Sequence, residues 1–216
     1  MLKAVIRIQW KACWHIVTAL TIAAFALPVV SVRVGWRGAE ANLPHFLTEL
    51  ELWGLLYPAL AAIAAVALGV AIWVSDRRGH HIYALLLPVP RTKYVLLRYA
   101  AGLSLLLPIV VALWFGALAA TLTLDLPTGT RTFAHALALK FALALLLCFG
   151  LAFAAAAASA RSVGITFRLL GILLAVHIAV VLLKPRTNLL WTLVTALATW
   201  PGPFSVLGGR WMLIDV

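Results

Sequence analysis

Charge, and acidic charge most of all, is scarce in this chain. Charged residues make up 11% of its 216 residues, and only six of them are Asp or Glu. A soluble globular domain averages about 25% charged residues. The hydrophobic fraction of 65% is also more than a water-soluble fold of this length can bury. The composition therefore predicts an all-α integral membrane protein, with lipid as the solvent for most of its surface.

The few acids all fall in predicted loops or at the C-terminal end: Glu40, Glu49, Glu51, Asp76, Asp125 and Asp215. Carriers driven by protons or sodium usually hold the coupling ion on an ionisable group inside the membrane. The lack of carboxylates in the predicted spans therefore counts against an ion-coupled carrier.

Residues that carry catalysis or bind metals are also few and scattered. Cys13 and Cys148 lie in apolar stretches without metal-type spacing. His15, His135 and His177 lie in different predicted spans, with no H-E-x-x-H or G-x-S-x-G motif. There is no G-x-x-x-x-G-K-[ST] loop, so the chain cannot bind ATP in that way. We expect no catalytic residue, no metal site and no directly bound cofactor.

Long apolar segments dominate what is present, and the whole chain, 1–216, is predicted to be a single transmembrane domain. Five segments are expected to cross the bilayer as helices: 13–32, 52–74, 95–122, 133–160 and 169–183. A further apolar segment, 189–200, is shorter than the roughly 17–25 residues that a crossing needs. It is followed by Pro201-Gly202-Pro203, and is predicted to be re-entrant, interfacial or the start of an incomplete sixth span.

Basic residues predict the orientation of these spans. They gather in three segments that would face the same side: Lys3, Arg7, Lys11, Arg77, Arg78, Arg91, Lys93, Arg98, Arg161 and Arg168. By the positive-inside rule this side, and the N-terminus with it, is cytoplasmic.

The N-terminal segment 1–12 carries three of these cations at a spacing of four residues. Lys3, Arg7 and Lys11 therefore share one helical face, as in a helix that lies along a membrane interface. The alternative is that the segment is only the cytoplasmic flank of the first span.

Lys140 lies well inside a predicted span, about two turns from its outer end. Its long stem can carry the ammonium to the outer interface. Alternatively, Lys140 contacts an anionic headgroup or a substrate on a translocation path, for which His177 is a second candidate.

The loop 75–94 is the most polar stretch of the chain. Charged residues at its start lead to a glycine, then to an apolar turn that Pro88 and Pro90 end before a basic restart. A short helix of this kind presents an apolar face that favours a protein partner or the bilayer interface.

This loop resembles the first cytoplasmic loop of ABC-2 type transporter permeases. The matching residues are Asp76, Arg77, Gly79, Leu85, Leu87, Pro88, Pro90, Arg91, Tyr94 and Arg98. The segment 1–12 resembles the elbow helix of the family, and the topology is similar over residues 1–185. Family members usually end with a full sixth span and a basic tail, so here the sixth span is displaced or degenerate, or the chain is truncated.

The resemblance implies a permease subunit without enzymatic activity, in the cytoplasmic membrane of a prokaryote. Its partners would be a separate ATPase, which binds the ATP and Mg²⁺, a second permease copy or paralogue, and the lipid bilayer, but no nucleic acid. The loop would be the coupling helix that docks on the ATPase, through Asp76, Arg77, Arg78, Gly79, Ile82, Tyr83, Leu85, Leu86, Leu87, Pro88, Pro90 and Arg91. Alternatives are a haem-exporter-like permease and a non-transporting scaffold that recruits a soluble partner through the same loop.

Overall fold

The computed structural model describes residues 2–38, 50, 52–78, 90–122, 131–158, 172, 196, 202–208 and 210–215. Almost all of these residues are helical. The described part contains four long helices: α1 (Leu2–Gly38), α3 (Leu56–Arg78), α5 (Arg91–Leu122) and α6 (Ala134–Ala157). Each includes a segment long and apolar enough to cross a membrane. The prediction of an all-α chain with several membrane-length helices is confirmed for these four.

The chain divides into two compact units, Met1–Phe153 with Arg210–Val216, and Ala154–Gly209. The second unit contains the end of α6 and a short 3-10 helix, η1 (Pro203–Val206). The predicted fifth span and the predicted segment 189–200 lie outside the described residues, except for Ile172 and Ala196, which are both helical.

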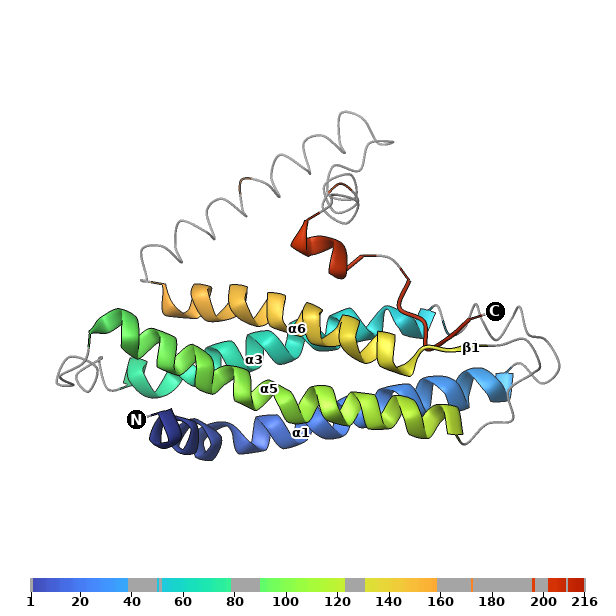
Figure 1. Cartoon of the computed structure of the whole chain (residues 1–216), viewed down its shortest axis with the longest axis horizontal. Coiled ribbons are helices and arrows are strands. Elements are labelled where there is room, and N and C mark those ends of the chain that lie inside the picture. Colours follow the sequence, from blue (N-terminus) through green and yellow to red (C-terminus); the bar gives the residue numbers. More distant parts are fainter. Residues whose placement is uncertain are drawn as a thin grey trace. The chain divides into compact units, whose positions relative to one another are not determined.

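The four long helices of the first unit lie side by side along its length, and helices next to each other in sequence run in opposite directions (Figure 1). Burial on α1 follows one narrow stripe of residues three or four positions apart: Gln9, Cys13, Val17, Leu20, Ala24, Pro28 and Ser31. Most of the other described side chains of α1 are apolar and at least partly exposed, as expected for a surface that faces lipid.

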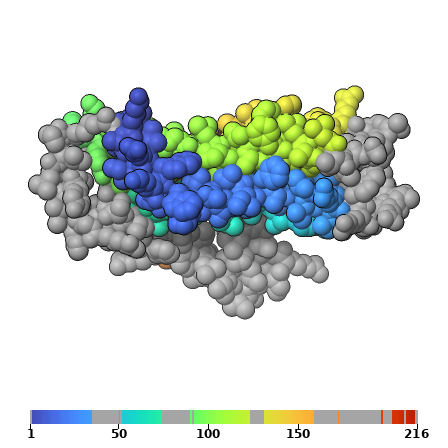
Figure 2. Space-filling model, turned by 90° about the horizontal axis from the view of Figure 1, so that it is seen from below, coloured from blue at the N-terminus to red at the C-terminus, as the bar shows by residue number. Residues whose placement is uncertain are grey.

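The predicted interfacial segment 1–12 and the predicted first span form one unbroken helix, α1. No glycine or proline separates them, and Lys, Arg, Ala and Leu are good helix formers. The N-terminal part of α1, dark blue in Figure 2, nevertheless runs across the direction of the rest of the helix. Lys3, Arg7 and Lys11 are exposed on this part.

The helices on either side of the predicted loop 75–94 extend further into it than expected. Helix α3 continues through Arg78, and α5 begins at Arg91, directly after Pro90. Pro90 lies just outside α5, and its carbonyl accepts a hydrogen bond from the amide of Tyr94 in the first turn at 3.1 Å. Basic side chains favour helix and can reach polar surroundings from a helix end, which explains the extension on both sides.

A two-stranded sheet brings the C-terminal residues back to the helices. Strand β2 (Ile214–Asp215) pairs antiparallel with β1 (Arg131–Thr132), which precedes α6. The amide of Phe133 also donates to the carbonyl of Leu213 at 2.8 Å. The C-terminal residues therefore lie at the end of the bundle opposite the N-terminus (Figure 1).

Candidate functional site

A buried arginine lies at the end of the bundle that carries the N-terminus. Arg98 of α5 is only 6% exposed. Its guanidinium carbon is 5.0 Å from the centroid of the Trp73 ring on α3 and 5.4 Å from that of the Tyr94 ring. A cation held over aromatic faces in this way is stabilised by about 2 kcal/mol when it is desolvated. The pair Trp73 and Arg98 therefore joins α3 to α5.

Gln9 of α1 contacts Arg98 as well, so this helix is joined to the same cluster. Its side chain is 3% exposed, and its Nε2 donates to the backbone carbonyl of Arg98 at 3.4 Å. Gln9, Trp73, Tyr94 and Arg98 are called the arginine cluster below. Within the described residues, Gln9 Oε1 and Trp73 Nε1 are buried without a hydrogen-bond partner. Each such group costs about 1–3 kcal/mol, so the polar cluster is not explained by stability alone.

Aromatic rings from α6 pack beside the arginine cluster. Phe153 lies 5.3 Å from Trp73 and 5.3 Å from Tyr99, measured between ring centroids. One turn of α6 away, Phe149 stacks on Tyr99 at 5.7 Å. These contacts hold α3, α5 and α6 together next to the cluster.

The residues predicted to couple to a partner lie in sequence between Trp73 and Tyr94, two members of this cluster. Asp76, Arg77 and Arg78 are the last residues of α3, and Arg91 is the first of α5, whereas Pro90 is exposed just before α5. The remaining predicted coupling positions lie outside the described residues: Gly79, Ile82, Tyr83, Leu85, Leu86, Leu87 and Pro88. His177, predicted as a contact on a translocation path, lies outside them as well.

Sequence reasoning identified Tyr94 and Arg98 but missed Trp73 and Gln9. Gln9 is a polar uncharged residue in an otherwise basic and apolar segment, which is a signal that could have been used. Trp73 lies in an apolar span, and nothing in its sequence context distinguishes it from other membrane tryptophans.

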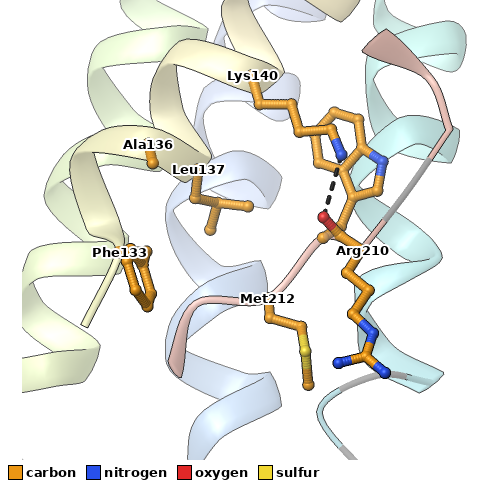
Figure 3. Close-up of a pocket in the computed structure, with 7 residues that line it drawn as sticks. Phe133, Ala136, Leu137, Lys140, Arg210 and Met212 are labelled. Carbon is orange, nitrogen blue, oxygen red and sulfur yellow. Dashed lines mark hydrogen bonds between the residues drawn. The ribbon is translucent and has the colours of Figure 1, made fainter. Parts of the chain in front are cut away.

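A hollow of about 240 Å³ lies at the opposite end of the bundle (Figure 3). Its lining residues come from the start of α6 and from the C-terminal segment: Phe133, Ala136, Leu137, Lys140, Arg210, Trp211 and Met212. The ammonium of Lys140 donates to the backbone carbonyl of Arg210 at 3.0 Å and lies 4.7 Å from the centroid of the Trp211 ring. Lys140 therefore holds the C-terminal segment against α6.

Residues 210–215, called the C-terminal strap below, also contact α3. Trp211 is 5% exposed, and its ring stacks on that of Tyr57 at a centroid distance of 6.4 Å. The Tyr57 hydroxyl lies 3.4 Å from Ser31 Oγ of α1. An added Cβ at Gly54 would be 2.7 Å from the carbonyl oxygen of Trp211, so only glycine allows this approach. The strap thus links α6 and α3, and through Tyr57 also α1.

Lys140 was predicted either to carry its ammonium to the outer interface or to contact an anionic headgroup or substrate, and its surroundings bear on both interpretations. Its ammonium reaches the end of the bundle, as a snorkelling lysine does, and meets groups of the strap there. It also lines the hollow described above. His135, five residues earlier in α6, accepts a hydrogen bond at Nδ1 from the indole of Trp114 at 2.9 Å. Among the described residues no three His, Cys, Asp or Glu side chains come together as a metal site.

Comparison with known proteins adds no relative. No protein family, no curated protein and no solved structure matches this chain. Function is therefore inferred from the sequence pattern around the loop 75–94 and from the geometry of the two ends of the bundle.

Proposed function

We propose that the chain is the membrane-spanning permease subunit of an ABC-2 type ATP-driven transporter, working in export. Support comes from the four membrane-length helices and from the resemblance of the loop 75–94 to a coupling loop. A separate ATPase subunit would bind ATP and Mg²⁺ and dock on this loop. Two permease chains, identical or paralogous, would form the pathway in the cytoplasmic membrane of a prokaryote.

The observation that carries this proposal is the arginine cluster at the base of the loop. The loop leaves α3 after Arg78 and returns to α5 at Arg91. Trp73 and Arg98 join these two helices just before and just after the loop, and Gln9 adds α1. A movement of the loop would therefore displace three helices together, which is what a coupling element must do.

The proposed orientation also assigns a side to the strap. A cytoplasmic N-terminus, as the basic residues predict, implies that the opposite end of the bundle faces outward. The strap lies at that opposite end, so the C-terminal residues would be outside. A chain with its N-terminus inside and these residues outside crosses the membrane an odd number of times. Four crossings by the described helices plus the predicted span 169–183 satisfy this count.

Co-purification from native membranes tests the proposal. We expect an ATPase to co-purify with the full chain and to be lost on Arg91→Glu or on Leu85→Asp in the loop. Arg33→Glu makes the same charge change on an exposed residue near the far end of α1, and should retain the ATPase.

Three outcomes would contradict the proposal. One is the absence of any co-purifying ATPase, and another is an ATPase that is indifferent to both loop variants. The third is a partner without ATPase activity that is lost on the same loop variants, because it would identify a scaffold that does not transport.

A further inference from the structure

The arginine cluster contains two buried polar atoms that lack a hydrogen-bond partner among the described residues: Gln9 Oε1 on α1 and Trp73 Nε1 on α3. The first can only accept a hydrogen bond and the second can only donate one. Both side chains are more than nine-tenths buried, with exposed fractions of 3% and 6%. Buried polar groups nearly always have a partner in the protein or in ordered water, so these two atoms point to a bound ligand.

The contact with Arg98 fixes the orientation of the Gln9 amide. Gln9 Nε2 donates to the backbone carbonyl of Arg98 at 3.4 Å, and a carbonyl can only accept. Exchanging the nitrogen and the oxygen of this amide would place two acceptors against each other. Gln9 Oε1 is therefore the atom that needs a donor, while the indole of Trp73, which lies beside the guanidinium of Arg98, needs an acceptor.

The surroundings of these two atoms select a small neutral ligand. The guanidinium carbon of Arg98 lies 5.0 Å from the centroid of the Trp73 ring, so a cation beside the indole would be repelled. An anion that carries no proton cannot donate to Gln9 Oε1. The ring of Phe153 packs 5.3 Å from that of Trp73, measured between centroids, which restricts the space beside the indole. Water is the smallest neutral molecule that both donates and accepts hydrogen bonds.

The position of the cluster along the bundle gives water a short way in. Trp73 lies five residues before the end of α3 at Arg78, which is about 7.5 Å along the helix axis. Arg7 and Lys11, which flank Gln9 in sequence, are exposed. Basic residues gather where a membrane protein meets the headgroups, so the cluster lies near the hydrated interface rather than at the middle of the bilayer.

We infer that the arginine cluster holds internal water, which accepts from Trp73 Nε1 and donates to Gln9 Oε1. One molecule, or two in line, meets both requirements, since a buried water typically makes about three hydrogen bonds. Such water joins α1 to α3 through hydrogen bonds and offsets the cost of burying the two groups. The inference does not depend on the transport function proposed above.

Nuclear magnetic resonance of the full chain in lipid nanodiscs, with the tryptophan indoles labelled with nitrogen-15, tests the inference. Trp73→Phe identifies the Trp73 signal among those of the nine tryptophans. We expect magnetisation to pass directly from water to the indole proton of Trp73, with the sign of a water that tumbles with the protein. The transfer should persist in Tyr94→Phe, which removes a hydroxyl that can relay it within the cluster.

Gln9→Met tests whether the same water also serves Gln9. It removes the acceptor and keeps an unbranched side chain, and the transfer to Trp73 should fall about two- to tenfold, the factor that the loss of one neutral hydrogen bond implies. Ile8→Met is the matched control, because Ile8 is the neighbouring residue of α1 and is 64% exposed. It should leave the transfer unchanged.

Absence of transfer from water to Trp73 in the unaltered chain would overturn the inference. Transfer from lipid protons instead would place lipid beside the indole and overturn it too. Loss of the transfer in Tyr94→Phe would identify a relayed signal, with the same consequence. Equal transfer in Gln9→Met and Ile8→Met would contradict a water shared by the two residues. If Gln9→Met fails to fold, the unaltered chain and Tyr94→Phe decide.

Discussion

Replacing Gly116 with alanine is a direct test of how α1 and α5 pack. An added Cβ at Gly116 would overlap the carbonyl oxygen of Phe25 and lie 3.0 Å from its carbonyl carbon and its Cα. All three atoms belong to the backbone of α1, so no change of rotamer can relieve the overlap. The two helices must move apart, and the contacts between them along the bundle are strained.

The change in the free energy of unfolding caused by Gly116→Ala has two contributions of opposite sign. Overpacking of a close contact costs about 1–3 kcal/mol. Replacing glycine with alanine inside a helix contributes up to about 1 kcal/mol in the other direction. Gly150→Ala separates these terms, because its nearest neighbour would be the Tyr99 hydroxyl at 3.7 Å, an ordinary contact. The difference between the two variants leaves the packing term, so Gly116→Ala should be about 1–3 kcal/mol less stable than Gly150→Ala.

Unfolding of the purified protein in mixed micelles, followed by circular dichroism, measures this difference. A destabilisation of 1 kcal/mol lowers the Tm of a protein of this size by roughly 2–4 °C. The variants should therefore differ by roughly 2–12 °C, with Gly116→Ala the lower. If Gly116→Ala unfolds at or above the temperature of Gly150→Ala, the close packing of α1 against α5 at this point is refuted.

Three further predictions concern the two ends of the bundle. Trp211→Ala removes a buried ring from the strap and should lower the free energy of unfolding by about 3–5 kcal/mol, whereas Trp211→Phe should lower it less; equal losses would contradict the stacking argument. In a background without Cys13 and Cys148, a membrane-impermeant thiol reagent on intact cells should label Asp215→Cys but not Lys3→Cys, and labelling of both from outside would refute the proposed orientation. Arg98→Lys keeps the charge but loses the planar group that lies over Trp73 and Tyr94. The ATPase should still co-purify while ATP-driven transport falls, and unchanged transport would contradict the coupling role of the cluster.

The sequence by itself determined which segments form the four long helices, and it predicted the ends of two of them closely. Predicted spans 95–122 and 133–160 agree with α5 and α6 within a few residues. This success has a simple physical basis, because a backbone in hydrocarbon must satisfy its hydrogen bonds internally and long apolar segments therefore become helices. Basic residues were less reliable as boundaries, since they extend α3 and α5 into the predicted loop.

Hydropathy could not predict which face of each helix is buried. On α1, Val17 is buried and Ile22 is exposed, yet both are apolar and β-branched. In water such residues would mark one face, but in lipid the exposed face is as apolar as the buried one. The helix contacts that bring Gln9, Trp73 and Arg98 together were therefore decided only in the tertiary structure, although Arg98 itself was recognised from the loop motif.

The C-terminal strap is the clearest case of a feature decided by tertiary structure. Residues 210–215 have no periodic pattern and are too short to form an element alone. Their position depends on partners far away in sequence: the strand β1, the ring of Tyr57, the space beside Gly54 and the ammonium of Lys140. The apolar composition specified helices in lipid, but the side of the bundle to which the strap returns depended on these contacts.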